Sequence, residues 1–139
     1  MNRLRKALPP DLAPAYGGFL EVLAVLEPAK AGLTDVLPGT RMPGRPLSDA
    51  LAAFEAGLRE AADRMEAWRA PAVSDEWEGC RHGLEAASAL AVRLRTEPPE
   101  LAGFEGLLGL VETLLDPLEA FAAAEERFRS LRRRGGVTG

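Results

Sequence analysis

Apolar residues recur along this chain at alternating intervals of three and four, in blocks separated by proline and glycine. One block keeps this spacing from Leu47 to Trp68, and a second keeps it from Trp77 to Leu94. This is the period of an α-helix that buries one face. No run alternates apolar and polar residues as a half-buried strand does, so the pattern predicts an all-α protein.

Four helices follow from this spacing. Proline and glycine clusters separate them, and serine or aspartate near several of the starts can cap free backbone N–H groups. Because the connections are short, neighbouring helices are expected to run antiparallel, and the simplest architecture is an up-down antiparallel four-helix bundle. The expected helices span about residues 11–27, 48–69, 74–96 and 100–134.

Two prolines fall inside apolar blocks. Pro28 removes a backbone donor and is expected to kink or end the first helix, with a further short turn or two from Ala29 to Leu37. Pro117 either kinks the last helix or, with Asp116 as an N-cap, divides it into two collinear helices. Residues 38–46 contain three prolines and two glycines, which predicts the longest loop of the chain.

Length and composition indicate a single folded domain. The 139 residues are 47% apolar and 27% charged, close to the average for globular proteins. We expect residues 1–139 to form one helical domain with flexible tails at 1–10 and 135–139. The single cysteine, Cys80, forbids an internal disulfide and fits a reducing compartment. No apolar run reaches the roughly 20 residues that span a bilayer, so we expect a cytoplasmic protein without a membrane partner.

Charge is unevenly distributed along the chain. Residues 1–10 carry three basic groups, residues 127–139 carry five, and neither segment has an acidic group. The 9 basic and 21 acidic residues between them give residues 11–126 a net charge of −12, and the whole chain has −4. An acidic body repels phosphate backbones, so no nucleic-acid partner is expected. Within the second helix, Glu55–Arg59 and Glu60–Arg64 are i, i+4 pairs that predict its solvent side.

The last helix carries more apolar residues than one buried face needs. A helix that is apolar nearly all round is normally covered on two sides, and the first helix shows the same excess. We therefore expect an interface, with a homodimer as the favoured arrangement and a docked protein partner as the other. The predicted interface residues are Leu107, Leu110, Leu114, Phe121, Phe128, Phe19 and Val22.

Glycines inside helices suggest either close helix packing or a slot for a flat ligand. Each costs about 0.5–1 kcal/mol relative to alanine, and close packing between the third and fourth helices is the favoured explanation. If the slot exists instead, it is an apolar pocket between helices. The predicted pocket residues are Tyr16, Trp68, Trp77, Gly103 and Gly106.

Candidate chemistry is sparse. His82 shares a helix face with Glu78 and Glu85, but with one histidine and one cysteine in the chain we expect no metal site and no cofactor. Cys80 falls at a core position, and His82 two residues later points elsewhere, so no catalytic role is expected for either.

The sequence therefore favours a non-enzymatic helical-bundle interaction module that self-associates or docks a partner helix. The alternative is a small-molecule carrier or sensor with an apolar pocket between helices. A third hypothesis, an enzyme with a metal held by carboxylates, has the least support because the Glu-x-x-His motifs of such sites are absent.

Overall fold

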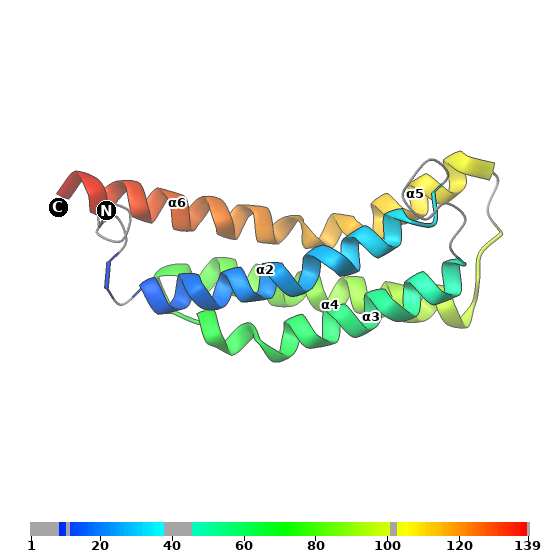
Figure 1. Ribbon diagram of the computed structural model, residues 1–139, viewed down its shortest axis with the longest axis horizontal. Coiled ribbons are helices and arrows are strands. Elements are labelled where there is room, and N and C mark those ends of the chain that lie inside the picture. The colour runs from blue at the N-terminus through cyan, green and yellow to red at the C-terminus, as the bar shows by residue number, and fades with distance from the viewer. Residues whose placement is uncertain (1–8, 11, 38–45, 101–102, 139) are drawn as a thin grey trace.

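The computed structural model describes residues 9–10, 12–37, 46–100 and 103–138, with side chains as far as residue 132. Within these ranges it contains helices and no strand, and the protein is an all-α bundle, which confirms the predicted fold class (Figure 1). The elements are α2 (Ala13–Thr34), α3 (Leu47–Asp63), the 3₁₀ turns η1 (Met65–Trp68) and η2 (Pro71–Val73), α4 (Ser74–Thr96), α5 (Gly103–Leu115), the 3₁₀ turn η3 (Asp116–Glu119) and α6 (Ala120–Thr138).

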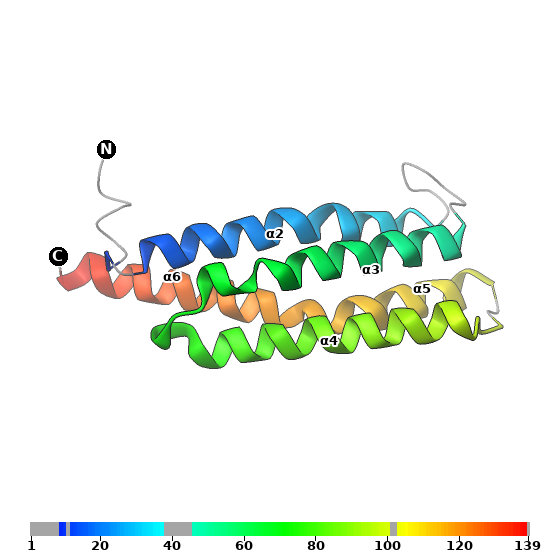
Figure 2. The same cartoon turned by 90° about the horizontal axis from the view of Figure 1, so that it is seen from below.

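The helices lie side by side along one long axis. Figure 2 shows that α2, α3, α4 and the α5–η3–α6 segment run in alternating directions. The backbones come close between α2 and α3, between α3 and α4, and between α4 and η3–α6. Few backbone positions of α2 and α6 come close to each other, so side chains largely close that fourth side. We refer to it below as the α2–α6 side.

Aromatic rings fill the centre of the bundle. Phe19 of α2 lies 4.9 Å from Trp68 and 5.2 Å from Phe128, measured between ring centroids, and Trp68 lies 6.1 Å from Phe128. All three side chains are buried. Residues from α2, η1 and α6 therefore share one core, which is how the first and last helices are held together across the α2–α6 side.

Of the two outcomes predicted at Pro28, an end of the first helix is wrong, and a kink stays a prediction. α2 continues without interruption to Thr34. Pro28 is exposed, and so is Ala24, whose carbonyl lacks a hydrogen-bond donor because proline has no N–H. Ala29 and Leu33, which follow Pro28, are buried. Packing of this last part of α2 holds it helical despite the missing hydrogen bond.

The solvent side of α3 differs from the prediction. Glu60 does pair with Arg64, at 3.2 Å, but Glu55 is buried and pairs with Arg95 of α4 instead of Arg59. The prediction that Glu55 marks the exposed side is therefore wrong. A long arginine from the neighbouring helix makes it possible to bury the carboxylate.

The turn η3, which contains Pro117, divides the last helical segment into α5 and α6, and division into two helices was one of the two predictions. Asp116 does not cap α6 but lies inside the turn η3. Gly83 of α4 packs against this turn so closely that an added Cβ would collide with the carbonyl oxygen of Pro117. Close helix packing therefore explains Gly83, whereas Gly103 and Gly109 face open space.

The structure describes only part of the two segments that were predicted to be flexible tails. α6 is helical as far as Thr138, beyond Gly135 and Gly136. The expected cap Asp11, the loop 38–45 and residues 1–8 lie outside the described residues. The flexibility of 1–10 and 135–139 stays a prediction.

Candidate interaction site

Most of the predicted interface residues belong to the core. Leu107 and Leu110 of α5 are half-buried and pack against the core. The other members are almost fully buried within the single chain: Phe19, Val22, Leu114, Phe121 and Phe128. Of these, Phe121 also lines a surface groove, which is described below. The apolar excess of the first and last helices is used mainly to build the bundle's own centre.

A different apolar surface remains on α5. Only Val111 and Leu114 of this helix are buried, although most of its side chains are apolar. Phe104 is 49% exposed, the highest value for a large apolar side chain in the described part of the protein. Phe104, Leu108 and Leu115 are spaced i, i+4, i+11, which places them on one side of the helix.

This side of α5 leads into a groove on the α2–α6 side. The groove has a volume of about 440 Å³. We call it the α2–α6 groove. Its lining residues are Leu23, Glu27 and Lys30 of α2, Leu115 of α5, Leu118 and Glu119 of η3, and Phe121, Ala122 and Glu125 of α6.

Two exposed apolar side chains lie on helices that line the α2–α6 groove. Leu20 is 43% exposed and precedes Leu23 by three residues, so it shares the groove-lining side of α2. Phe104 shares the side of α5 that carries Leu115. Of the three most exposed large apolar residues in the described part of the chain, Leu20 lies three residues before the lining residue Leu23, Phe104 lies eleven residues before the lining residue Leu115, and Val92 lies on α4.

The charged residues of the groove are partly paired. Glu27 pairs with Lys30 at 3.5 Å, and Glu125 pairs with Arg129 at 3.3 Å. Glu119 is exposed and forms no ion pair with another described residue. The groove thus has an apolar floor and an edge on which negative charge predominates.

A larger groove of about 650 Å³ lies between α3 and α4, and Trp77 lines it together with Met65, Arg59 and Arg81. Of the predicted pocket residues, only Trp77 lies there. Trp68 is in the core. The guanidinium of Arg132 lies over Tyr16, 5.0 Å from the centroid of the tyrosine ring. The remaining two are on α5, which does not line this groove: Gly103 and Gly106. The predicted pocket is not assembled.

Both indole N–H groups have internal partners. Trp77 donates to the backbone oxygen of Met65 at 2.8 Å, and Trp68 donates to the sulfur of the same Met65 at 3.2 Å. A ligand in the groove between α3 and α4 would find neither donor free.

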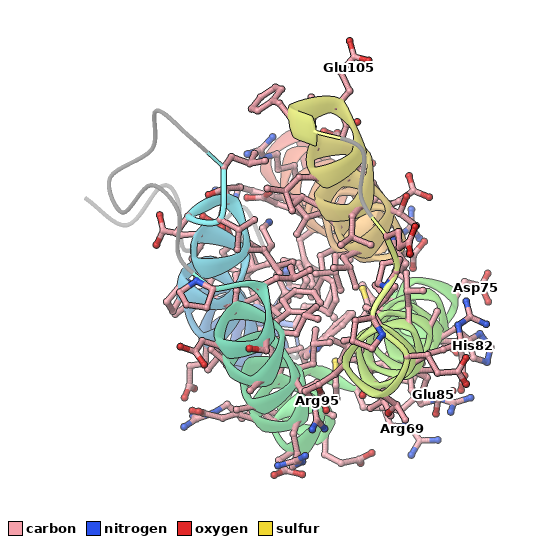
Figure 3. All side chains as sticks on the ribbon, turned by 90° about the vertical axis from the view of Figure 1, so that its right-hand side faces the viewer. Arg69, Asp75, His82, Glu85, Arg95 and Glu105 are labelled. Carbon is pink, nitrogen blue, oxygen red and sulfur yellow. The ribbon has the colours of Figure 1, made fainter. Side chains whose placement is uncertain are left out.

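The residues with chemical potential are separated. Cys80 is buried in the core, and this burial raises the pKa of its thiol to about 12. Figure 3 shows His82 and Glu85 on the outer side of α4, pointing away from the core. Arg81 binds both Glu78 and Glu85, at 2.9 and 2.8 Å. Among the described residues, no three His, Cys, Asp or Glu side chains are grouped closely enough to hold a metal ion.

Comparison with known protein families, with curated proteins and with solved structures found no match for this chain. No relative therefore supplies a residue assignment. In the described residues, no helix combines the length and apolar character needed to cross a bilayer.

Of the residues that line the α2–α6 groove, only Phe121 was among the interface residues predicted from the sequence. Leu20 carries a recognisable signal, because it falls outside the 3-4 stripe that Phe19, Leu23 and Leu26 form on the same helix. Phe104 carries none, since it continues a regular stripe with Leu108 and Val111 and differs only in lying at the end of the bundle, where no neighbouring helix covers it.

Proposed function

We propose that this protein is a non-enzymatic interaction module that docks a partner helix along the α2–α6 groove. The observation that carries the proposal is the apolar floor of this groove, lined by Leu23, Leu115 and Leu118, with the exposed Leu20 three residues before Leu23 on the same side of α2. Contiguous exposed apolar surface in a folded domain typically marks an interaction site. In helix-in-groove recognition, an amphipathic helix lays its apolar face into such a groove.

A matched pair of substitutions tests this proposal. Leu20 and Val92 are both 43% exposed, but Val92 lies on α4, which does not line the groove. The full chain, tagged and expressed in its own cells, is purified as wild type, Leu20→Glu and Val92→Glu, and co-purifying proteins are quantified by mass spectrometry.

We expect a defined partner whose recovery falls about tenfold with Leu20→Glu, the effect of roughly 1.4 kcal/mol of binding free energy, and is unchanged with Val92→Glu. Circular dichroism checks that both variants remain folded. Equal recovery from all three proteins, or no partner above background, would contradict the proposal.

The alternative function, a small-molecule carrier or sensor, has one supporting observation. Trp77 lines the groove between α3 and α4, whose volume of about 650 Å³ falls within the range of ligand pockets. An apolar ligand there should shift the tryptophan emission of the wild-type protein, and Ala62→Phe, which fills part of the groove without adding an indole, should reduce the shift. Unchanged emission with saturating fatty acid or naphthalene-sulfonate dye would remove this alternative.

A further inference from the structure

Carboxylates run along the outer edge of the α2–α6 groove. They are spaced seven, four and three residues apart on α5 and η3, and Glu119 at the end of the series lines the groove itself. All four are exposed, and none forms an ion pair with another described residue: Glu105, Glu112, Asp116 and Glu119. Figure 3 shows Glu105 projecting outward from α5.

This carboxylate edge adjoins the apolar surface. Glu112 follows Leu108 by four residues and precedes Leu115 by three, so it lies one helical turn from each. Nearby, Glu27 pairs with Lys30 and Glu125 pairs with Arg129. Arg132 lies over Tyr16, four residues before Leu20, and adds positive charge at that end of α2. The unpaired carboxylates therefore set a negative sign at the α5–η3 end of the groove.

The negative charge of this edge disfavours a second copy of the chain as the molecule that occupies the groove. In a two-fold symmetric dimer through this groove, each residue faces the same patch of the other copy. Glu112 and Glu119 of one copy would then approach carboxylates of the other, and like charges across an interface oppose association. The net charge of −4 on each copy adds to this repulsion.

We propose, building on the docking function above, that the α2–α6 groove receives a basic amphipathic helix from another protein. The apolar face of that helix lies against Leu20, Leu23 and Leu115, and its lysine or arginine side chains lie over the carboxylates from Glu105 to Glu119. Charge complementarity at such an edge chiefly sets specificity and association rate, while the apolar floor supplies affinity.

Synthetic helices test the chemistry directly. The probe is an 18-residue peptide with leucines at i, i+3, i+7 and i+11 and lysines on the adjacent positions, titrated into the full-length protein at about 0.15 M salt, where long-range attraction is screened. One matched peptide replaces the lysines with glutamate, and a second keeps the lysines and replaces the leucines with serine. We expect binding of the leucine–lysine peptide alone.

Two double variants separate the groove from general attraction to an acidic protein. Glu112→Lys with Glu119→Lys should weaken the leucine–lysine peptide by about a hundredfold, roughly 2.7 kcal/mol. Asp63→Lys with Glu97→Lys makes the same change in net charge at exposed positions of α3 and the end of α4, and should leave affinity nearly unchanged. An equal loss in both double variants would overturn the proposal, because binding would then follow net charge.

Two further results would also overturn it. Equal binding of the lysine and glutamate peptides would show that the groove docks helices without regard to charge, which leaves the docking function intact and removes the basic partner. A dimer in native mass spectrometry of the protein alone that Leu20→Glu dissociates would identify the occupant as a second copy. Failure of every peptide overturns the basic partner alone, since the co-purification experiment tests the docking function independently.

Discussion

Arg95 of α4 donates two hydrogen bonds to the carboxylate of Glu55 in α3, with N···O distances of 2.6 and 3.0 Å. The Glu55 side chain is 7% exposed and that of Arg95 is 47% exposed, so the arginine extends from solvent to reach an otherwise buried charge. Figure 3 shows Arg95 where α3 and α4 lie against each other. The pair fixes the register of these two helices with a geometry that apolar contacts alone do not define.

Removing the arginine should destabilise the fold. Arg95→Ala leaves the carboxylate of Glu55 without its two donors, and we expect a lower free energy of unfolding and a lower urea midpoint. Arg93→Ala, two residues earlier on the same helix and exposed, is the matched control and should change stability by less than about 0.5 kcal/mol. Urea denaturation of the three proteins measures both. Equal free energies of unfolding for Arg95→Ala and Arg93→Ala would show that the Glu55–Arg95 pair does not contribute to stability.

The same pair predicts a pH dependence of stability. The hydrogen bond from Arg95 holds the pKa of Glu55 below its ordinary value of 4.5 in the folded protein. A carboxylate with a lowered folded pKa contributes stability above its unfolded pKa, and this contribution is lost as pH falls through the folded pKa. The difference in unfolding free energy between wild type and Glu55→Gln should therefore shrink between about pH 6 and pH 3. A difference that stays constant over this range would contradict the assignment.

Two glycines in helices should respond to alanine in opposite directions. Gly83→Ala places a Cβ against the carbonyl oxygen of Pro117, so α4 and η3 must move apart, at an expected loss of about 1–3 kcal/mol. Gly109→Ala meets no atom within 4 Å and should gain about 0.5–1 kcal/mol from the lower backbone entropy of the unfolded chain. Thermal denaturation should lower Tm for the first variant and raise it for the second. A stable Gly83→Ala protein would mean that this close approach is not required.

The thiol of Cys80 should be unreactive while the protein is folded. It is fully buried, and burial is the main reason that its pKa rises to about 12. Because the thiolate is the reactive form, alkylation by iodoacetamide at about pH 8 should be slower by at least about a hundredfold in the native protein than in urea. Comparable rates in the two states would show that the core opens at this position.

The sequence was sufficient to predict the fold class and most of the core. The 3-4 spacing from Leu47 to Trp68 identified one buried face, because apolar burial repeats with the helical period. The predicted helix end at Pro28 failed because it depends on a tertiary fact: the following residues, Ala29 and Leu33, are buried against other elements and keep the helix intact. The burial of Glu55 depends in the same way on Arg95, forty residues further along the chain.

Less of the candidate site than of the fold could be predicted from the sequence. An excess of apolar residues on the first and last helices was recognised, but the sequence does not tell which of them the bundle itself covers. Phe121 and Phe128 meet Phe19 in the centre, whereas Phe104 lies where no helix covers it. That distinction follows from the helix lengths and from the wide spacing of α2 and α6, which appear only when the whole bundle is assembled.

The most direct test of the docking function is site-specific photo-cross-linking in the cells that produce the protein. A photoreactive phenylalanine analogue is placed at Leu20 in one variant and at Val92 in another, since the two native side chains are equally exposed. The account predicts a discrete adduct from position 20, of a mass that exceeds one chain and differs from two, and at least about tenfold less of it from position 92. Equal labelling from both positions, or no adduct from position 20, would contradict it.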